Sequence, residues 1–183
     1  MSHNSEYKPL WVDKIDVATR QIRTAIRLLF EETDPIVVHT IVAATHQVLC
    51  DLSRQKGLKS AVKPPGYNKK LNIAENFFKH ADQDPSGRIN VEPLPELTAM
   101  LLFDSVVMMQ GISNKLPMEA KIYWSWYMVN HEEDFVGAGS AIDSIIKDGR
   151  EMQTMSFKEL RQLLRFQQVM NTDEPLPVWA ELG

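Results

Sequence analysis

The sequence predicts an all-α protein: an antiparallel bundle of five to six helices that forms a single domain over residues 1–183. Apolar residues recur at helical spacing along several long segments, and almost no segment alternates apolar and polar residues as a strand would. The length of 183 residues suits one domain with a sizeable core. The 8 glycines are too few for a loop-rich sandwich or a glycine-lined phosphate site. Helices packed on helices are therefore favoured.

Two long helices are expected at the start of the chain. Residues 12–32 carry apolar side chains at helical spacing, namely Ile15, Ala18, Ile22, Ala25, Ile26 and Leu29. Asp34 then offers an N-cap and Pro35 fits the first position of a second helix, which we expect to reach about Ser53. Because the connection is so short, the two helices are expected to run antiparallel.

Further helices are expected between segments that contain proline and glycine. They are predicted over residues 73–81, 96–110, 117–130 and about 140–147, and from a capping box at Ser156 and Glu159 to about Met170. Gly111 is expected to end the helix over 96–110. Residues 59–72 are expected to form a basic loop, and residues 171–183 an extended C-terminal tail.

The predicted helix over 117–130 is rich in aromatic residues. Tyr123, Trp126 and Tyr127 fall on one side of it and are expected to fill the core. Trp124 is expected to be more exposed.

The net charge of −4 is unevenly distributed. Residues 52–74 contain no acidic residue and six basic ones: Arg54, Lys56, Lys59, Lys63, Lys69 and Lys70. The net charge of the rest of the chain is therefore −4 − 6 = −10. Such asymmetry can mark a surface that faces phosphates. A solvated loop that opposes aggregation is the other interpretation.

Composition and short motifs limit the expected cellular location and the kinds of site that the chain can form. The first residues lack the pattern of a signal peptide, and no apolar run reaches the roughly 18 residues of a membrane span. Cys50, the single cysteine, cannot form an internal disulfide and is expected to be buried. Neither a phosphate-binding glycine loop nor a nucleophile elbow is present. We therefore expect a cytoplasmic protein without a cofactor or a membrane partner.

The short helix predicted over 73–81 carries the most specific motif, Asn76-Phe-Phe-Lys79-His80. Its spacing places the amide of Asn76 and the imidazole of His80 one turn apart on one face. An Asn-x-x-Lys-His helix end in an all-helical domain of this size resembles the HEPN superfamily. That superfamily includes RNases of toxin–antitoxin and defence systems, and inactive relatives that bind nucleotides or proteins. The resemblance implies a bacterial protein that forms a homodimer.

The resemblance is incomplete at one position. Active HEPN proteins carry an arginine four to six residues before the histidine, whereas Glu75 lies five residues before His80 here. A carboxylate would repel the phosphate that an arginine would clamp. The resemblance therefore implies binding without robust catalysis. Any catalysis would be that of a metal-independent ribonuclease, with Lys79 or Arg88 supplying the missing cation.

Residues 82–93 resemble an EF-hand calcium loop. The possible oxygen ligands are Asp82, Asp84, Ser86, Asn90 and Glu92. Pro93 occupies the twelfth position, where a glutamate normally supplies two oxygens, and Glu92 comes one residue too early. Calcium binding is therefore an alternative to a simple turn formed by residues 84–87.

Asp104 is the polar residue that most needs an explanation, because one turn on either side of it is apolar. Burying its carboxylate alone would cost several kcal/mol, so a partner is expected. The candidates are Lys79, His80 or an arginine of the first helix, and a pair with His80 could act as a general base and its orienting acid. His39 and His46 lie too far apart in sequence to chelate one metal closely and are expected to form surface or interhelical hydrogen bonds.

The leading functional hypothesis is an accessory module that binds a nucleotide, RNA or a partner protein. Asn76, Lys79 and His80 would line its site with Asp104 in support, and Lys63, Lys69 and Lys70 would contact phosphates. The first alternative is a protein-interaction or oligomerisation module without a small-molecule site, indicated by the 9 methionines, a tail that is expected to be exposed, and the acidic remainder of the chain. The second alternative is calcium binding over residues 82–92.

Overall fold

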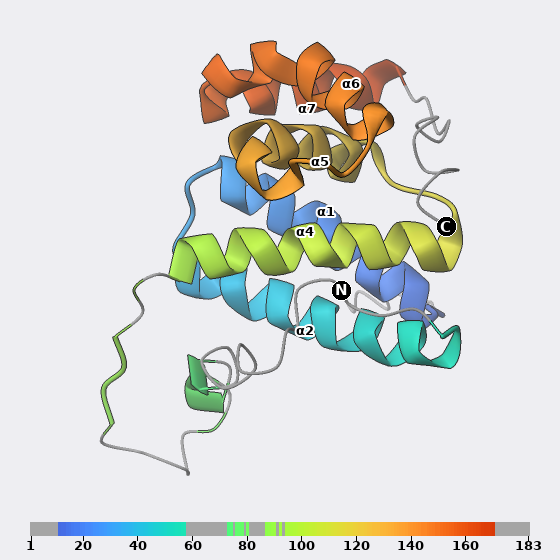
Figure 1. Cartoon of the computed structure of the whole chain (residues 1–183). Helices are drawn as coiled ribbons and strands as arrows, with labels where there is room; N and C mark the ends of the chain where they lie inside the picture. Colours follow the sequence, from blue (N-terminus) through green and yellow to red (C-terminus); the bar gives the residue numbers. More distant parts are fainter. Residues whose placement is uncertain are drawn as a thin grey trace, which may run out of the picture.

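The computed structural model describes residues 11–57, 73–74, 76–78, 80, 87–90, 92 and 94–170. The α-helices are α1 (Lys14–Phe30), α2 (Pro35–Gln55), α4 (Leu94–Ser113), α5 (Met118–Asn130), α6 (Ser140–Gly149) and α7 (Phe157–Met170). Two 3₁₀ helices, η1 (Glu132–Phe135) and η2 (Arg150–Thr154), flank α6, and the described residues between 73 and 78 are also helical. The all-α bundle is confirmed (Figure 1).

Each of the first two helices begins after an aspartate N-cap, and the cap at Asp34 is the predicted one. The carboxylate of Asp13 accepts a hydrogen bond from the backbone N–H of Asp16, and that of Asp34 accepts one from Ile36. Each carboxylate thereby satisfies one of the N–H groups that a helix leaves unpaired at its start. The short connection reverses the chain, so α1 and α2 run antiparallel as expected (Figure 1).

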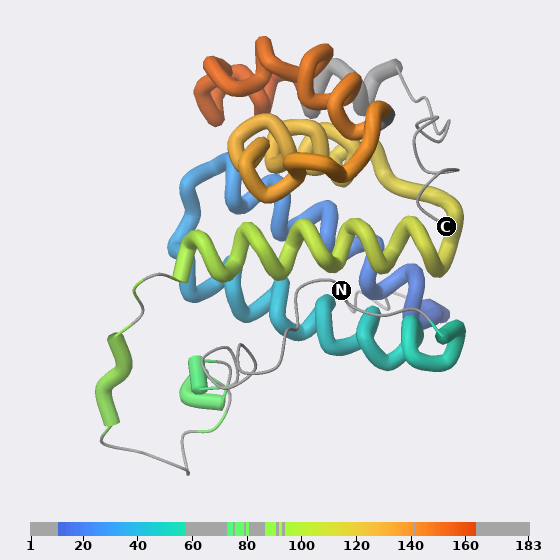
Figure 2. Tube along the Cα trace, viewed as in Figure 1, coloured from blue at the N-terminus to red at the C-terminus, as the bar shows by residue number. Residues whose placement is uncertain are grey.

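Helices α2 and α4, by contrast, run parallel. Three pairs of interacting residues show this: His39 with Thr98, His46 with Asp104, and Lys56 with the carbonyl of Ile112. Their sequence separations of 59, 58 and 56 are almost constant, as only a parallel arrangement allows. The two helices therefore lie side by side and point the same way (Figures 1 and 2).

Helix α4 lies at the centre of the bundle, against α1, α2 and α5. It buries residues on all sides, including Leu102, Asp104 and Val106, which are 0% exposed. The prediction that Gly111 ends this helix is wrong, because the helix continues to Ser113. A glycine inside a helix costs only about 1 kcal/mol, which packing on three neighbouring helices outweighs. The chain instead turns at Asn114, whose φ of 54° lies in the left-handed region.

Helix α5 lies between α1 and α4 on one side and α6, η2 and α7 on the other (Figure 1). The expectation that Trp124 is exposed is wrong: it is 3% exposed, and its ring lies against that of Phe103 of α4, with centroids 4.7 Å apart. Trp126 is instead half-buried. The hydroxyl of Tyr123 is fully buried and donates a 2.7 Å hydrogen bond to the carbonyl of Ala99, which joins α5 to α4.

By length and composition, α2 could cross a membrane. Half of its most apolar stretch is buried inside the bundle, and the core helix of a soluble protein passes the same test.

The capping box predicted at the start of α7 is present. The hydroxyl oxygen of Ser156 accepts from the N–H of Glu159 at 3.3 Å, and the Glu159 carboxylate accepts from the N–H of Ser156 at 2.8 Å. Ser156→Ala removes the cap and is expected to lower the free energy of unfolding by about 1 kcal/mol. Urea unfolding followed by circular dichroism measures this change. Ser144→Ala, at an exposed position of α6, is the control and should change stability by less than about 0.5 kcal/mol.

Candidate functional site

The structure places Asn76 and His80 on the surface. Both side chains are exposed, and the N–H of His80 donates a 3.0 Å hydrogen bond to the carbonyl of Asn76, which is the spacing of one helical turn. The amide and the imidazole therefore follow each other by one turn at the end of a short helical segment, as the sequence predicts. This segment lies beside α2, away from α5, α6 and α7 (Figure 2).

The short helical segment is attached to the bundle through Phe78. The Phe78 ring meets the buried His39 ring edge to face, with centroids 6.0 Å apart. His39 in turn bonds Thr98 of α4, with 2.9 Å between Nδ1 and Oγ1. Since the Thr98 hydroxyl donates its proton to the carbonyl of Leu94, it must accept from His39, and Nδ1 carries the hydrogen. A chain of contacts thus runs from α4 through α2 to the exposed helix end.

Asp104 is fully buried and bonds His46, with 2.7 Å between Oδ2 and Nε2. A buried partner was expected, but His46 was not among the candidates Lys79, His80 and the arginines of the first helix. The separation of 58 residues between His46 and Asp104 explains this, because no local pattern reveals which helix packs on which. The structure therefore brings Asp104 to a residue of the core, whereas Asn76 and His80 are exposed.

The His46–Asp104 pair is ionic at neutral pH. Burial alone would lower the pKa of His46, but its hydrogen bonds to Asp104 and Cys50 and the charge of Asp104 outweigh that effect and raise the pKa from 6.5 to about 9. Both ring nitrogens of the protonated imidazole are donors, and Nδ1 lies 3.6 Å from Sγ of the buried Cys50. The buried cation is therefore satisfied on both sides, and the expectation that Cys50 is buried is confirmed.

Only part of the possible calcium loop falls within the described residues. Asn90 and Glu92 are exposed, and the side-chain oxygen of Asn90 accepts a 3.0 Å hydrogen bond from the N–H of Glu92. This arrangement is typical of a turn. Asp82, Asp84 and Ser86 lie outside the described residues, as do Lys63, Lys69, Lys70, Lys79 and the tail over 171–183.

A second polar cluster, which the sequence did not indicate, joins α1 to α5. Glu119 is only 2% exposed, and its Oε1 accepts hydrogen bonds from Nε of Arg23 and Nη2 of Arg27. Burial would raise the pKa of Glu119, but hydrogen bonds from its own backbone, from Arg27 and from Arg23 lower it overall. The cluster thus holds an anionic carboxylate in the core and two half-exposed guanidinium groups at the surface.

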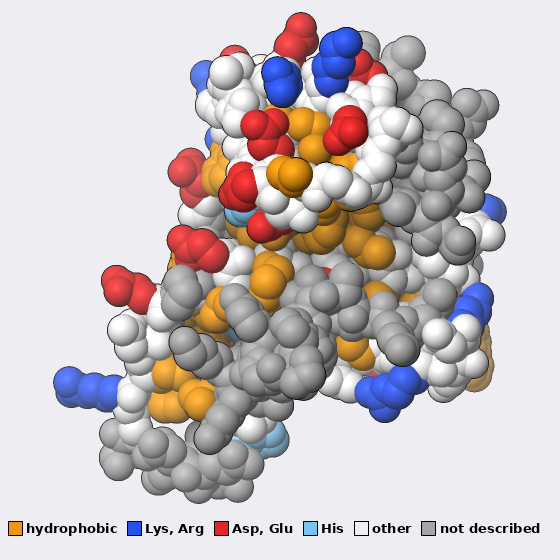
Figure 3. Space-filling model, in the orientation of Figure 1, with side chains coloured by type: hydrophobic (Ala, Val, Ile, Leu, Met, Phe, Trp, Pro, Cys, Tyr) orange, Lys and Arg blue, Asp and Glu red, His pale blue; other side chains and the backbone are white. Residues whose placement is uncertain are grey.

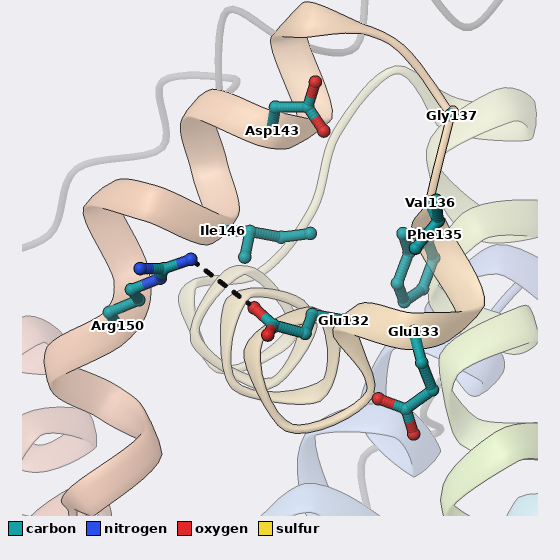
Figure 4. A pocket seen from close by; sticks show the side chains of 8 residues that line it. All are labelled: Glu132, Glu133, Phe135, Val136, Gly137, Asp143, Ile146 and Arg150. Atoms are coloured by element: carbon teal, nitrogen blue, oxygen red, sulfur yellow. Dashed lines mark ion pairs between the residues drawn. The ribbon is translucent and has the colours of Figure 1, made fainter.

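A hollow of about 520 Å³ lies between η1, the turn after it and α6. Its apolar lining consists of Phe135, Val136 and Ile146, and Figure 4 shows Ile146 pointing into it between Asp143 and the η1 residues. Glu132 faces Arg150 across one side at 3.8 Å. Acidic side chains gather in this upper part of the molecule (Figure 3). Of the predicted site residues that the structure describes, none lines the hollow.

Comparison with known proteins finds no match to this chain among family models, curated proteins or solved structures. The resemblance to HEPN domains therefore stays a prediction.

The raised pKa of His46 predicts a pH-dependent stability. Because the folded-state pKa exceeds the ordinary value, the stabilisation is complete below about pH 6.5 and is lost as the pH rises through about 9. Its full size is on the order of 3 kcal/mol. Urea unfolding at several pH values between about 6 and 10 measures the loss.

Asp104→Asn is the matched control for this titration. The variant should be less stable at neutral pH, and its stability should change much less between about pH 6 and 10. If the free energy of unfolding of Asp104→Asn depends on pH as steeply as that of the unchanged protein, groups other than His46 cause the dependence.

Proposed function

We propose that this protein is a HEPN-like accessory module that binds a phosphate-bearing ligand, a nucleotide or RNA, without robust catalysis. One observation carries the proposal: the exposed Asn76 and His80 stand one turn apart on a segment that Phe78 attaches to the buried His39. An amide and an imidazole at this spacing can both donate hydrogen bonds to phosphate oxygens.

Attachment to the bundle supports a binding role for this surface. The hydrogen bond between His39 and Thr98 holds the His39 ring, and the His39 ring supports Phe78, two residues before His80. Side chains held in place by packing lose less conformational entropy when a ligand binds. The proposal extends the site to Lys79 and to Lys63, Lys69 and Lys70, whose charges would attract the nucleic-acid backbone.

Two observations support binding over catalysis. Glu75 stands where active HEPN proteins have an arginine. Asp104, which could have oriented His80 as a general base, is 0% exposed and bonds His46. We further propose, from the sequence alone, a bacterial and cytoplasmic homodimer without a membrane partner.

The double variant Asn76→Ala, His80→Ala tests the proposal. Its affinity for a short fluorescent single-stranded RNA of mixed sequence, measured by anisotropy, should fall by about tenfold or more, because two donors to phosphate are lost. Gln47→Ala, which removes an exposed amide from α2, should bind as the unchanged protein does. RNA affinity that is equal in all three proteins would end the proposal.

A protein-interaction module is the second candidate, and exposed apolar side chains favour it. Ile36 and Val37 in the first turn of α2 are 40% and 47% exposed, and Ile73 of the short helical segment is 52% exposed. The contact between His39 and Phe78 places the short segment near the start of α2. Apolar side chains grouped at a surface are typical of protein contacts.

This second candidate predicts an apolar dimer contact. Val37→Gln should weaken self-association about tenfold in sedimentation equilibrium, since a half-exposed apolar side chain leaves the contact. Val136→Gln is the control: it changes an equally apolar residue that follows η1 and is 86% exposed, and it should have no effect. If the protein without substitutions sediments as a monomer at every concentration, the dimer is excluded.

A further inference from the structure

The two arginines that meet Glu119 have more hydrogen-bonding capacity than the core uses. A guanidinium group carries five N–H donors in a planar fork. Within the described residues, the hydrogen bonds of Arg23 and Arg27 both go to one oxygen atom, Glu119 Oε1. The two side chains are 43% and 44% exposed, so their other N–H groups are available at the surface.

Glu119 also fixes where these donors lie. It is buried and anionic, and it draws both guanidinium groups to the same atom although their residues are one helical turn apart. Two arginine side chains with free rotation would lose this freedom when they bind a ligand, whereas side chains already held by a carboxylate lose less of it. The cluster is therefore organised before any ligand arrives.

The charge of the cluster favours an anion. Two guanidinium groups and one carboxylate leave 2 − 1 = +1, and the carboxylate is on the buried side. Arg20, one turn before Arg23 on α1, is exposed and adds a further positive charge along the helix. The planar forks of two neighbouring arginines match the several oxygens of a phosphate group.

We propose that Arg23 and Arg27 form a binding site for a phosphate group, positioned by Glu119. It is separate from the Asn76–His80 surface and does not depend on what that surface binds. A purely structural brace between α1 and α5 would need only one N–H from each arginine, and it would bind no phosphate.

Nuclear magnetic resonance of the unchanged, ¹⁵N-labelled protein tests the proposal directly. The Nε–H signals of Arg23 and Arg27 should shift saturably when inorganic phosphate replaces chloride at constant ionic strength. Uridine 5′-monophosphate should produce the same shifts and uridine should not, because only the former carries the phosphate. Shifts that do not saturate, or acetate binding as tightly as phosphate, would overturn the proposal.

Arginine-to-lysine variants separate the planar fork from mere charge. Arg23→Lys and Arg27→Lys, each made alone, keep the positive charge beside Glu119 and should bind phosphate about tenfold more weakly. Arg54→Lys is the control, because Arg54 is an exposed arginine of α2 that pairs with the exposed Asp51. Equal phosphate affinity in all of these variants would contradict the proposal. Thermal unfolding establishes that each variant is folded. The phosphate titration of the unchanged protein tests the proposal even if a variant does not fold.

Discussion

The ion pair between His46 and Asp104 is the interaction on which the arrangement of this bundle most depends. Both groups are buried, and their hydrogen bond joins two parallel helices, α2 and α4. A sliding of one helix along the other would leave an imidazolium and a carboxylate without partners, at a cost of several kcal/mol. No short turn links these helices to set their register. The ion pair and the nearby pair of His39 and Thr98 therefore favour one alignment over its neighbours.

The local features of the fold could be predicted from the sequence. Helix starts at Asp34 and Ser156 were recognisable because a cap involves residues only two or three positions apart. The need of Asp104 for a partner was also predictable, since it follows from the cost of burying a carboxylate. The identity of that partner was not, because it depends on α2 packing beside α4 in a parallel direction. The burial of Trp124 escaped prediction for the same reason: it depends on α5 packing beside α4, where the Trp124 ring lies 4.7 Å from that of Phe103.

The candidate binding residues likewise include some that a local sequence pattern predicts and some that only the fold brings together. The spacing of Asn76 and His80 is a local property and appears in the structure as expected. The cluster of Arg23, Arg27 and Glu119 joins residues 92 and 96 positions apart, so no motif announces it. Its only sequence signal is a set of arginines one turn apart, which is common on exposed helices. In both cases exposed polar groups depend on a buried residue: His39 beneath the Asn76–His80 surface, and Glu119 beneath Arg23 and Arg27.

The parallel direction of α2 and α4 also has a consequence for folding kinetics. Helices α1 and α2 can pair across a connection of a few residues, whereas α4 must find α2 across a sequence separation of nearly sixty. Local contacts form fast and distant ones slowly, so a hairpin of α1 and α2 would be the template on which α4 docks. The entropy of closing the long connection grows only with the logarithm of its length, by about 0.6 kcal/mol per doubling. The connection between these two helices can therefore lengthen or shorten during evolution at little cost to the stability of the bundle.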